Sequence, residues 1–327
     1  MIKVLDVGYG YLKWVNEGNV LKRQALVTVI PPGSLENRQG LDTIVIDGVE
    51  YLIGHHDFEN LQPVAASNTR NRVEDLEYKV LFLYAIAAQA DGADIATDIL
   101  TGLPIHTMNE EAPILIDVFA NKTFDVEYKG KSFTLSIGDV IVIPQGYGSS
   151  LYLTSSNPVL KTENVLVSDI GFQTNNYVYM QKGNLFNDLA DTHQDLGIGS
   201  AYEEIAKIVN KKTRSRKNYT KYDMDYVLDN GATVLDKNSQ PTKIHFQDDI
   251  DVIAVLDKQA KKIWSDIKNR YLDKGYPVDR VVFVGGSAAS LKERLLDNQK
   301  RDTLFPGAPQ DLQVLGYDLY ARSMSNV

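Results

Sequence analysis

The sequence contains no cysteine among its 327 residues. This excludes disulfide bridges, a thiol nucleophile and any cysteine-ligated zinc site, and it is typical of proteins from a reducing compartment. Long apolar segments are also missing, because the longest apolar run, residues 80–90, is too short to cross a bilayer. The first residues lack the basic and apolar regions of a signal peptide. We therefore expect a cytoplasmic protein with no membrane partner.

Positive charge and histidine are scarce too. The chain has 34 Lys and Arg against 43 Asp and Glu, a formal net charge of −9, and five histidines. Binding along a nucleic acid needs a local excess of positive charge, so we expect no direct contact with nucleic acid. The basic run at 207–221 is interpreted as a solvated helix end and loop, with contact to a polymer neighbour or to DNA as the alternative. His55 and His56 with Asp57 resemble a metal cluster, yet their polar surroundings favour a solvated loop.

Two halves of similar design follow from the order of apolar runs and turns. Each half starts with a strand, an acidic turn and a returning strand and later supplies helices, which indicates a duplicated α/β fold with a cleft between the halves. We expect domain I at 1–155, with a small inserted subdomain at about 31–70 and completed by a C-terminal helix at about 311–327. Domain II is expected at 156–310, with an inserted subdomain at about 185–245.

The expected elements come from apolar periodicity and from turn residues such as the Asp47-Gly48 pair of a hairpin. Strands are predicted at 2–7, 12–16, 25–30, 43–46, 50–53, 98–103, 124–128, 131–135, 140–143, 165–169, 177–180 and 281–284. Helices are predicted at 73–89, 110–120, 148–154, 201–209, 251–271, 288–296 and 315–323.

The stretch LDVGYGYLKWV near the N-terminus combines a buried strand with a glycine turn. Gly8 and Gly10 let the backbone approach a phosphate, and the N–H groups of such a turn form an anion-binding concavity. Lys13 would reach the same phosphates as a point charge. Asp6 is placed to hold Mg²⁺ through water, as suits a cation that keeps its hydration shell. The alternative for this stretch alone is an ordinary tight hairpin turn.

Two later stretches repeat this design. In VLVSDIGFQTNNYVYM, a buried strand ends in Asp169, turns at Gly171 and continues to Thr174, whose hydroxyl could donate to a phosphate. In VVFVGGSAAS, a buried strand ends at Gly285 and Gly286 and leads into a helix, where an adenosine ring would lie against the backbone. Each turn alone has a purely structural explanation, but three of them in this order indicate a nucleotide site.

Gln145 follows Pro144 at the end of a strand in the first half. A neutral amide there would orient a water molecule for in-line attack on a terminal phosphate, as glutamine does in other nucleotide hydrolases. A turn residue with a solvated side chain is the alternative. Positioning of the water and electrostatic stabilisation of the transition state would accelerate hydrolysis, so no covalent nucleophile is needed.

These motifs resemble those of the actin-like ATPase superfamily. DVGYG-x-x-K, SDIG-x-x-T and VGGS are similar to its phosphate-1, phosphate-2 and adenosine motifs, and TGLPI followed by IPQGYGS resembles the ParM/StbA-type plasmid-segregation branch and its archaeal relatives. The resemblance spans residue 2 to about residue 322. It implies an actin-like fold, with two ribonuclease-H-like α/β domains and Mg-ATP, or GTP in its place, in the cleft between them.

The resemblance also implies roles for individual residues. Asp6 and Asp169 would hold Mg²⁺ through water and Gln145 would position the attacking water, so these three are the catalytic candidates. Tyr9 and Tyr11 stand where many members carry a small hydroxyl residue, so backbone N–H groups must contribute more to binding of the γ-phosphate. The candidates for nucleotide contact are Gly8, Tyr9, Gly10, Lys13, Gly171, Phe172, Thr174, Glu204, Lys207, Gly285, Gly286 and Ser287.

The function implied by the resemblance is that of a filament-forming ATPase, which hydrolyses ATP within its own polymer to control disassembly. Plasmid or DNA segregation through a DNA-binding adaptor protein, or cytoskeletal organisation, would be its role. A small-molecule kinase of the sugar or acetate type is the alternative, but it needs a carboxylate base where this chain has Gln145, with Asp98 the nearest replacement. A structural protein that binds nucleotide without turnover is the third interpretation, against which Asp6, Asp169 and Gln145 argue.

Overall fold

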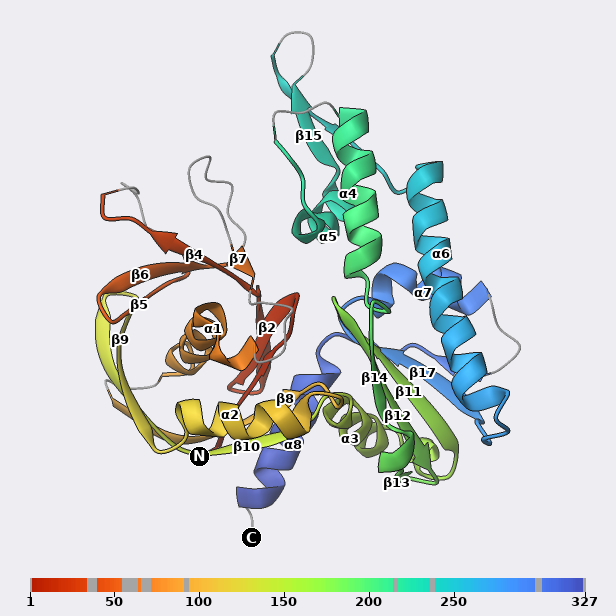
Figure 1. Ribbon diagram of the computed structural model, residues 1–327, viewed down its shortest axis with the longest axis horizontal. Coiled ribbons are helices and arrows are strands. Elements are labelled where there is room, and N and C mark those ends of the chain that lie inside the picture. The colour runs from red at the N-terminus through yellow and green to blue at the C-terminus, as the bar shows by residue number, and fades with distance from the viewer. Residues whose placement is uncertain are drawn as a thin grey trace.

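Two β-sheets lie side by side and carry the fold of this protein (Figure 1). The computed structural model describes residues 2–33, 40–54, 64–65, 72–90, 94–213, 217–235, 239–297 and 302–325. His55, His56 and Asp57 lie outside these residues, as do parts of the expected inserted subdomains and of the basic run. Among the helices of the described residues, none is long and apolar enough to cross a membrane.

The first sheet brings the ends of three parallel strands to one edge. Within the described residues it has ten strands, in the order β3-β2-β1-β8-β10-β9-β5-β6-β4-β7. Because β1, β8 and β10 run parallel, their carboxyl ends lie at the same edge of the sheet. Asp6, near the end of β1, and Gln145, directly after β10, therefore lie at this edge. The strands are β1 Ile2–Val7, β2 Tyr11–Asn16, β3 Asn19–Gln24, β4 Leu26–Ile30, β5 Thr43–Ile46, β6 Val49–Ile53, β7 Val64–Ala65, β8 Asp94–Leu103, β9 Lys122–Tyr128 and β10 Lys131–Pro144.

The second sheet repeats the pairing of the first. Strand β11 pairs antiparallel with β12 and parallel with β17, which pairs parallel with β18. In the first sheet, β1 pairs in the same way with β2 and β8, and β8 with β10. The expected duplicated α/β fold is therefore confirmed. The strands are β11 Asn164–Ile170, β12 Thr174–Gln181, β13 Asn184–Leu185, β14 Asp191–Gln194, β17 Arg280–Val284 and β18 Asp302–Leu304, with β15 Ala232–Leu235 and β16 Pro241–Ile244 forming a separate hairpin.

Each sheet has its own hydrophobic core. Helix α1 is apolar on nearly every side and is buried from Val80 to Ala87, and the first sheet curls around it (Figure 1). A helix that is hydrophobic all round belongs in a core. The second sheet packs against α4, α6 and α7. The helices are α1 Leu76–Ala87, α2 Met108–Phe119, α3 Tyr147–Ser156, α4 Gly199–Thr213, α5 Met224–Asn230, α6 Ile250–Ile267, α7 Ala288–Asp297 and α8 Leu312–Ser325.

Helices α3 and α8 lie at the junction of the two sheets. Leu153 of α3 packs in a core with strands of the second sheet, whereas Tyr317 of α8 packs with strands of the first. The helices approach so closely that a Cβ at Gly148 would lie 2.8 Å from the Tyr317 ring, and one at Gly316 would overlap the backbone of Gly148. The division of the chain into domains at residue 155 stays a prediction.

Several elements differ from those expected. Helix α5 and the short strands β7, β13, β14, β15, β16 and β18 were not predicted. Strand β3 was not predicted, because its residues are mostly exposed and polar and show no apolar alternation. The strands expected at 131–135 and 140–143 are one strand, β10, which continues through an irregularity between Ile137 and Val140 while pairing with β8. The hairpin of the expected inserted subdomain at 31–70 continues the first sheet, since β5 pairs with β9.

Candidate functional site

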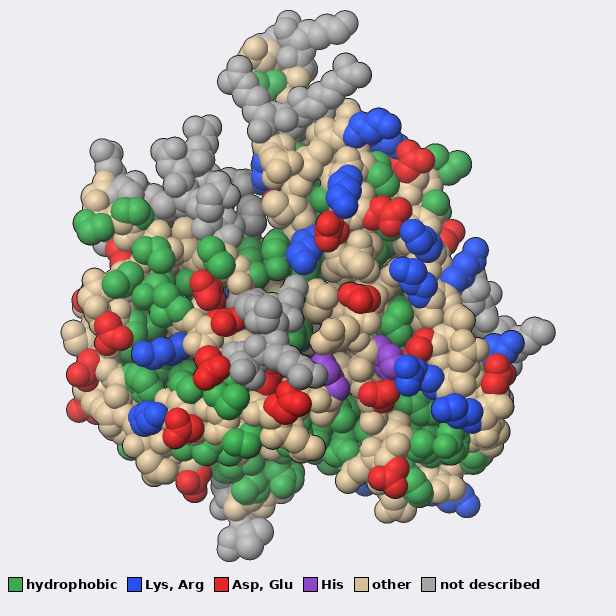
Figure 2. All heavy atoms as spheres, viewed as in Figure 1, with side chains coloured by type: hydrophobic (Ala, Val, Ile, Leu, Met, Phe, Trp, Pro, Cys, Tyr) green, Lys and Arg blue, Asp and Glu red, His purple; other side chains and the backbone are tan. Residues whose placement is uncertain are grey.

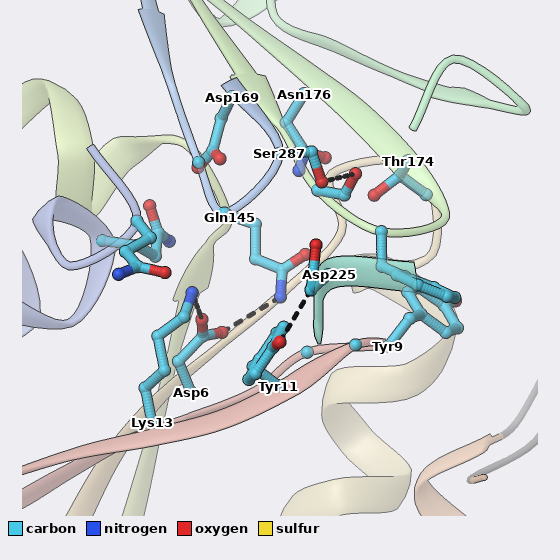
Figure 3. Close-up of a pocket in the computed structure, with 18 residues that line it drawn as sticks. Asp6, Tyr9, Tyr11, Lys13, Gln145, Asp169, Thr174, Asn176, Asp225 and Ser287 are labelled. Atoms are coloured by element: carbon cyan, nitrogen blue, oxygen red, sulfur yellow. Dashed lines mark hydrogen bonds and ion pairs between the residues drawn. The ribbon is translucent and has the colours of Figure 1, made fainter. Parts of the chain in front are cut away.

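A cavity lies between the two sheets and is lined from both (Figure 3). Four separate stretches of the sequence meet in it: the turn after β1, the residue after β10, the turn after β11 and the double glycine after β17. The structure brings these predicted site residues together: Asp6, Gly8, Tyr9, Gly10, Lys13, Gln145, Asp169, Gly171, Phe172, Thr174, Gly285, Gly286 and Ser287.

The two acidic turns have matching geometry. The N–H of Gly8 donates to the carbonyl of Tyr11 at 3.0 Å, and the N–H of Gly171 donates to the carbonyl of Thr174 at 2.8 Å. A Cβ at Gly8 would lie 2.9 Å from the Tyr11 carbonyl oxygen, and one at Gly171 would lie 3.1 Å from that of Thr174. Both turns therefore favour glycine because the chain folds back tightly on itself.

Asp6 is held by two side chains from its own sheet. Its Oδ1 accepts a hydrogen bond from Gln145 Nε2 at 3.2 Å, and its Oδ2 lies 3.6 Å from Lys13 Nζ. All three side chains are buried or nearly so. Lys13 faces Asp6 because the two residues are directly paired across β1 and β2. The carboxylate of Asp6, the cation of Lys13 and the amide of Gln145 thus lie together in the cavity, within reach of one ligand (Figure 3).

Asp169 is the buried carboxylate of the second turn. Burial raises its pKa to about 6, the nearby positive charge of Lys13 opposes this rise, and the negative charge of Asp6 adds to it. Its Oδ2 accepts a hydrogen bond from Ser149 Oγ at 3.4 Å. Ser149 is fixed by Gln313 of α8, whose Oε1 accepts from the Ser149 N–H at 3.2 Å and lies 3.1 Å from the Ser149 hydroxyl, so this oxygen and Asp169 share its single proton. The helix junction therefore orients this carboxylate.

The double-glycine turn packs against the second acidic turn. Gly285 has φ +94°, and a Cβ there would lie 2.5 Å from the Ile170 carbonyl oxygen. The Ser287 N–H donates to the same carbonyl at 3.1 Å, and its hydroxyl donates to the Gly171 carbonyl at 3.0 Å. By contrast, a Cβ at Gly286 would meet no atom within 4 Å. Gly285 serves the packing of the turn, whereas Gly286 leaves space in the cavity.

Contacts between the two halves close one side of the cavity. Asp225, which begins α5 with Met224, accepts hydrogen bonds from the Tyr11 hydroxyl at 2.7 Å and from the Tyr202 hydroxyl at 2.6 Å. Burial raises the pKa of both tyrosines and the Asp225 charge raises it further, so both donate at neutral pH. In addition, Gly10 lies against Phe172, since a Cβ at Gly10 would be 2.8 Å from that side chain.

Five residues that line the cavity were not among the predicted site residues: Tyr11, Asn176, Asp225, Gln310 and Gln313. Tyr11 had been noted only for its place in the first turn. Asn176 carries a usable signal, because it lies two positions after Thr174 on β12 and so shares its face of the strand.

Two predicted residues are not brought to the cavity. Glu204 and Lys207 lie on α4 and do not belong to the lining. Glu204 pairs with Lys258 of α6 at 3.3 Å, and Lys207 pairs with Glu203 one helical turn away at 3.4 Å. Their side chains are at least half exposed. In this structure they contribute to the outer surface of the second half.

Asp6 and Asp169 fit a hydrated magnesium ion. Within the described residues, no group of three or more His, Cys, Asp or Glu is arranged to hold a metal ion. Mg²⁺ usually keeps several waters and binds one or two carboxylates together with the phosphates of its substrate. Asp6 and Asp169, in one cavity with the glycine turns, therefore suit a magnesium ion that binds together with a nucleotide, whereas the third carboxylate of the lining, Asp225, accepts hydrogen bonds from Tyr11 and Tyr202.

Comparison with known families identifies both halves of the chain. Residues 5–148 match the family model described as the N-terminal domain of actin-like proteins, and residues 167–297 match that of the archaeal actin homologue MreB-like C-terminal domain. A search of curated proteins found no match.

Solved structures share the fold over almost the whole chain. Ta0583, an archaeal actin homolog, is 19% identical with a TM-score of 0.79 over 98% of this chain and 100% of that one. The chain of a 15-stranded ParM filament from Clostridium botulinum is 16% identical, with a TM-score of 0.76 over 98% of this chain and 99% of that one. Bacillus thuringiensis ParM with AMPPNP is 18% identical, with a TM-score of 0.66 over 100% of this chain and 99% of that one. The chain belongs to the actin-like proteins, and its fold is that of ParM and of archaeal actin homologues.

Proposed function

We propose that this protein is a magnesium-dependent ATPase that polymerises into filaments and uses hydrolysis to control their disassembly. The observation that carries the proposal is the meeting of two matching acidic glycine turns, one from each half, in a single cavity. A polyphosphate between two such turns would contact N–H groups from both halves. Its binding would therefore couple nucleotide state to the relative position of the halves.

Each residue would have a defined task. Asp6 and Asp169 would hold the hydrated magnesium ion, which supplies charge neutralisation to the phosphates. Lys13 and the N–H groups of the two turns would bind phosphate oxygens. Gln145, whose amide already points at Asp6, would orient the attacking water. The space beside Gly286 would receive the nucleoside.

Related structures support the proposed ligand and assembly. Ta0583 is known in complex with ADP, and Bacillus thuringiensis ParM with AMPPNP and with ADP. The Clostridium botulinum ParM forms a filament. For this chain we propose ATP, with GTP as a possible substitute, and copies of the chain itself as the main partner. The acidic net charge favours a DNA-binding adaptor over direct contact with DNA, in a cytoplasmic setting.

Sedimentation with phosphate release in the same tubes tests the proposal. The protein is incubated with Mg-ATP, with Mg-ADP or without nucleotide. We expect pelleting that rises with ATP and decays as phosphate appears. A protein that binds ATP yet stays in the supernatant and releases no phosphate would contradict the filament function and favour the small-molecule kinase, to be followed by a screen of acceptors.

Replacing Gln145 by alanine is expected to slow hydrolysis with little loss of ATP affinity. The amide would act on the attacking water and not on the ground-state nucleotide, and the loss of one preorganised group of this kind costs on the order of 10²-fold in rate. Single-turnover hydrolysis and nucleotide titration measure the two quantities separately. Gln181→Ala, on β12 outside the cavity lining, is the control. A large loss of affinity with unchanged turnover would refute the assigned role.

A further inference from the structure

Arg72 is a buried cation directly behind the first phosphate turn. Its side chain is fully buried at the start of the 3₁₀ turn before α1. Nη2 donates to the carbonyl of Val7 at 2.6 Å, and the guanidinium carbon lies 4.0 Å from the centre of the Tyr9 ring. Val7 and Tyr9 are the two neighbours of Gly8. Arg72 therefore contacts the turn on both sides of its first glycine.

Within the residues that the structure describes, Arg72 forms no ion pair. Its Nε and Nη1 atoms have no hydrogen-bond partner. Glu111 is also buried nearby, close enough to act on Tyr9, but it accepts a hydrogen bond from Thr107 and makes no ion pair with Arg72 among the described residues. Burying a cation without a paired anion costs several kcal/mol. Such a cost points to a role beyond packing.

The location of this charge suggests what it serves. Gly8 and Tyr9 of this turn line the cavity together with the carboxylates of Asp6, Asp169 and Asp225, which outnumber the lining cation Lys13 and would repel an anionic ligand. A cation behind the turn offsets this repulsion, and its effect is larger in a low-dielectric interior than in water. The effect grows with the number of negative charges on the ligand, so it favours a nucleoside triphosphate over a diphosphate.

We propose that Arg72 is a positioning residue of the nucleotide site, which fixes the first turn through Val7 and Tyr9 and favours binding of the terminal phosphate of a nucleoside triphosphate. This inference rests on the proposed function. It also gives Tyr9 a purpose in a position where a small hydroxyl residue was expected. Tyr9 has no short hydroxyl side chain that could donate a hydrogen bond to a phosphate, but its ring contacts the guanidinium of Arg72 and so links the turn to the buried cation.

Nucleotide affinities of neutral Arg72 variants test the inference. For Arg72→Met and Arg72→Gln, we expect the affinity for Mg-ATP to fall on the order of tenfold, the size expected for unit charges about 10 Å apart at an effective dielectric constant of about 20. The affinity for Mg-ADP should fall less, so the ratio of the two affinities changes. Arg72→Lys retains the charge and should largely restore the ratio.

Two further measurements separate this role from a structural one. The melting temperature of Arg72→Met should be unchanged or higher, because an unpaired buried charge is replaced by an apolar side chain of similar length. Arg280→Met, which breaks an ion pair with Glu163 in the second half, should leave the affinity ratio unchanged. If the wild type binds nucleotide and both neutral variants keep its ratio of Mg-ATP to Mg-ADP affinity, the inference about Arg72 is overturned, and the proposed function is not affected. Absence of nucleotide binding by the wild type overturns the proposed function and the inference with it.

Discussion

Replacing Asp169 by asparagine is expected to abolish nucleotide hydrolysis while leaving the fold intact. The carboxylate lies at the end of β11 in the cavity, where it would share the magnesium ion with Asp6. Asparagine keeps the shape and the hydrogen bond from Ser149 but removes the negative charge. Loss of one of the two carboxylates proposed to hold the ion should lower the turnover by at least about 10²-fold. Wild-type turnover in this variant would refute the assignment of the site.

The same substitution is expected to stabilise the nucleotide-free protein. The pKa of Asp169 is raised from 3.8 to about 6 by burial, so the folded state holds its proton more tightly than the unfolded state. Its ionisation therefore lowers stability as the pH rises from about 4 to about 6, by about 3 kcal/mol in all, and the loss stays constant above that range. Asparagine cannot ionise and escapes this loss. The advantage of the variant should be absent near pH 4 and complete above pH 6.

Thermal unfolding in a chelating buffer, with no nucleotide, measures this advantage across the pH range. Glu163→Gln is a control of opposite sign, because hydrogen bonding to Arg280 lowers the pKa of Glu163. That variant should be less stable than the wild type at neutral pH and should approach it under acid conditions. If Asp169→Asn is instead less stable than the wild type at pH 7, the carboxylate is a structural residue and its pKa is not raised by burial.

The turns of the site could be predicted from the sequence because their chemistry is local. A strand followed by an acidic residue and a glycine two positions on specifies a tight reversal, and Gly8 and Gly171 make matching hydrogen bonds in the structure. The pairing of Asp6 with Lys13 follows from the hairpin itself. These local sequence patterns do not reveal the order in which distant strands pair in the sheets. The meeting of the turns in one cavity was inferred from the duplicated design and from the occurrence of three such turns in this order, and the family resemblance agreed with it.

Residues from outside the turns could not be found in this way. Asp225 reaches the cavity from α5, far along the chain from its partner Tyr11, and Gln313 acts on Ser149 from the last helix. Neither follows a strand or a glycine, so no local signal marks them. Nucleotide contact of Glu204 was implied by the family resemblance and stays a prediction, and the structure places this residue outside the cavity lining. Its side chain instead pairs with Lys258, because α4 and α6 pack together at that point.

Gly285→Ala and Gly286→Val are expected to separate folding from binding at neighbouring positions. Gly285 has a positive φ, and an added Cβ would press on the Ile170 carbonyl and on the Asp169 carboxylate. The left-handed backbone costs roughly 1–2 kcal/mol and the overpacking another 1–3 kcal/mol. We expect Gly285→Ala to lower the free energy of unfolding by about 3 kcal/mol, with loss of the site as a consequence.

Gly286→Val should behave in the opposite way. No protein atom lies within 4 Å of a Cβ at this position, so the side chain meets no resistance from the fold, but it would occupy the cavity where the nucleoside is proposed to bind. We expect an unchanged melting temperature and an affinity for ATP lowered on the order of tenfold to a hundredfold, the cost of forcing a ligand past an added side chain. Gly307→Ala, also open to space but outside the cavity, is the control and should change neither quantity. If Gly286→Val binds ATP as tightly as the wild type, the nucleoside does not lie against the double-glycine turn, and the phosphates alone would have to fix the ligand.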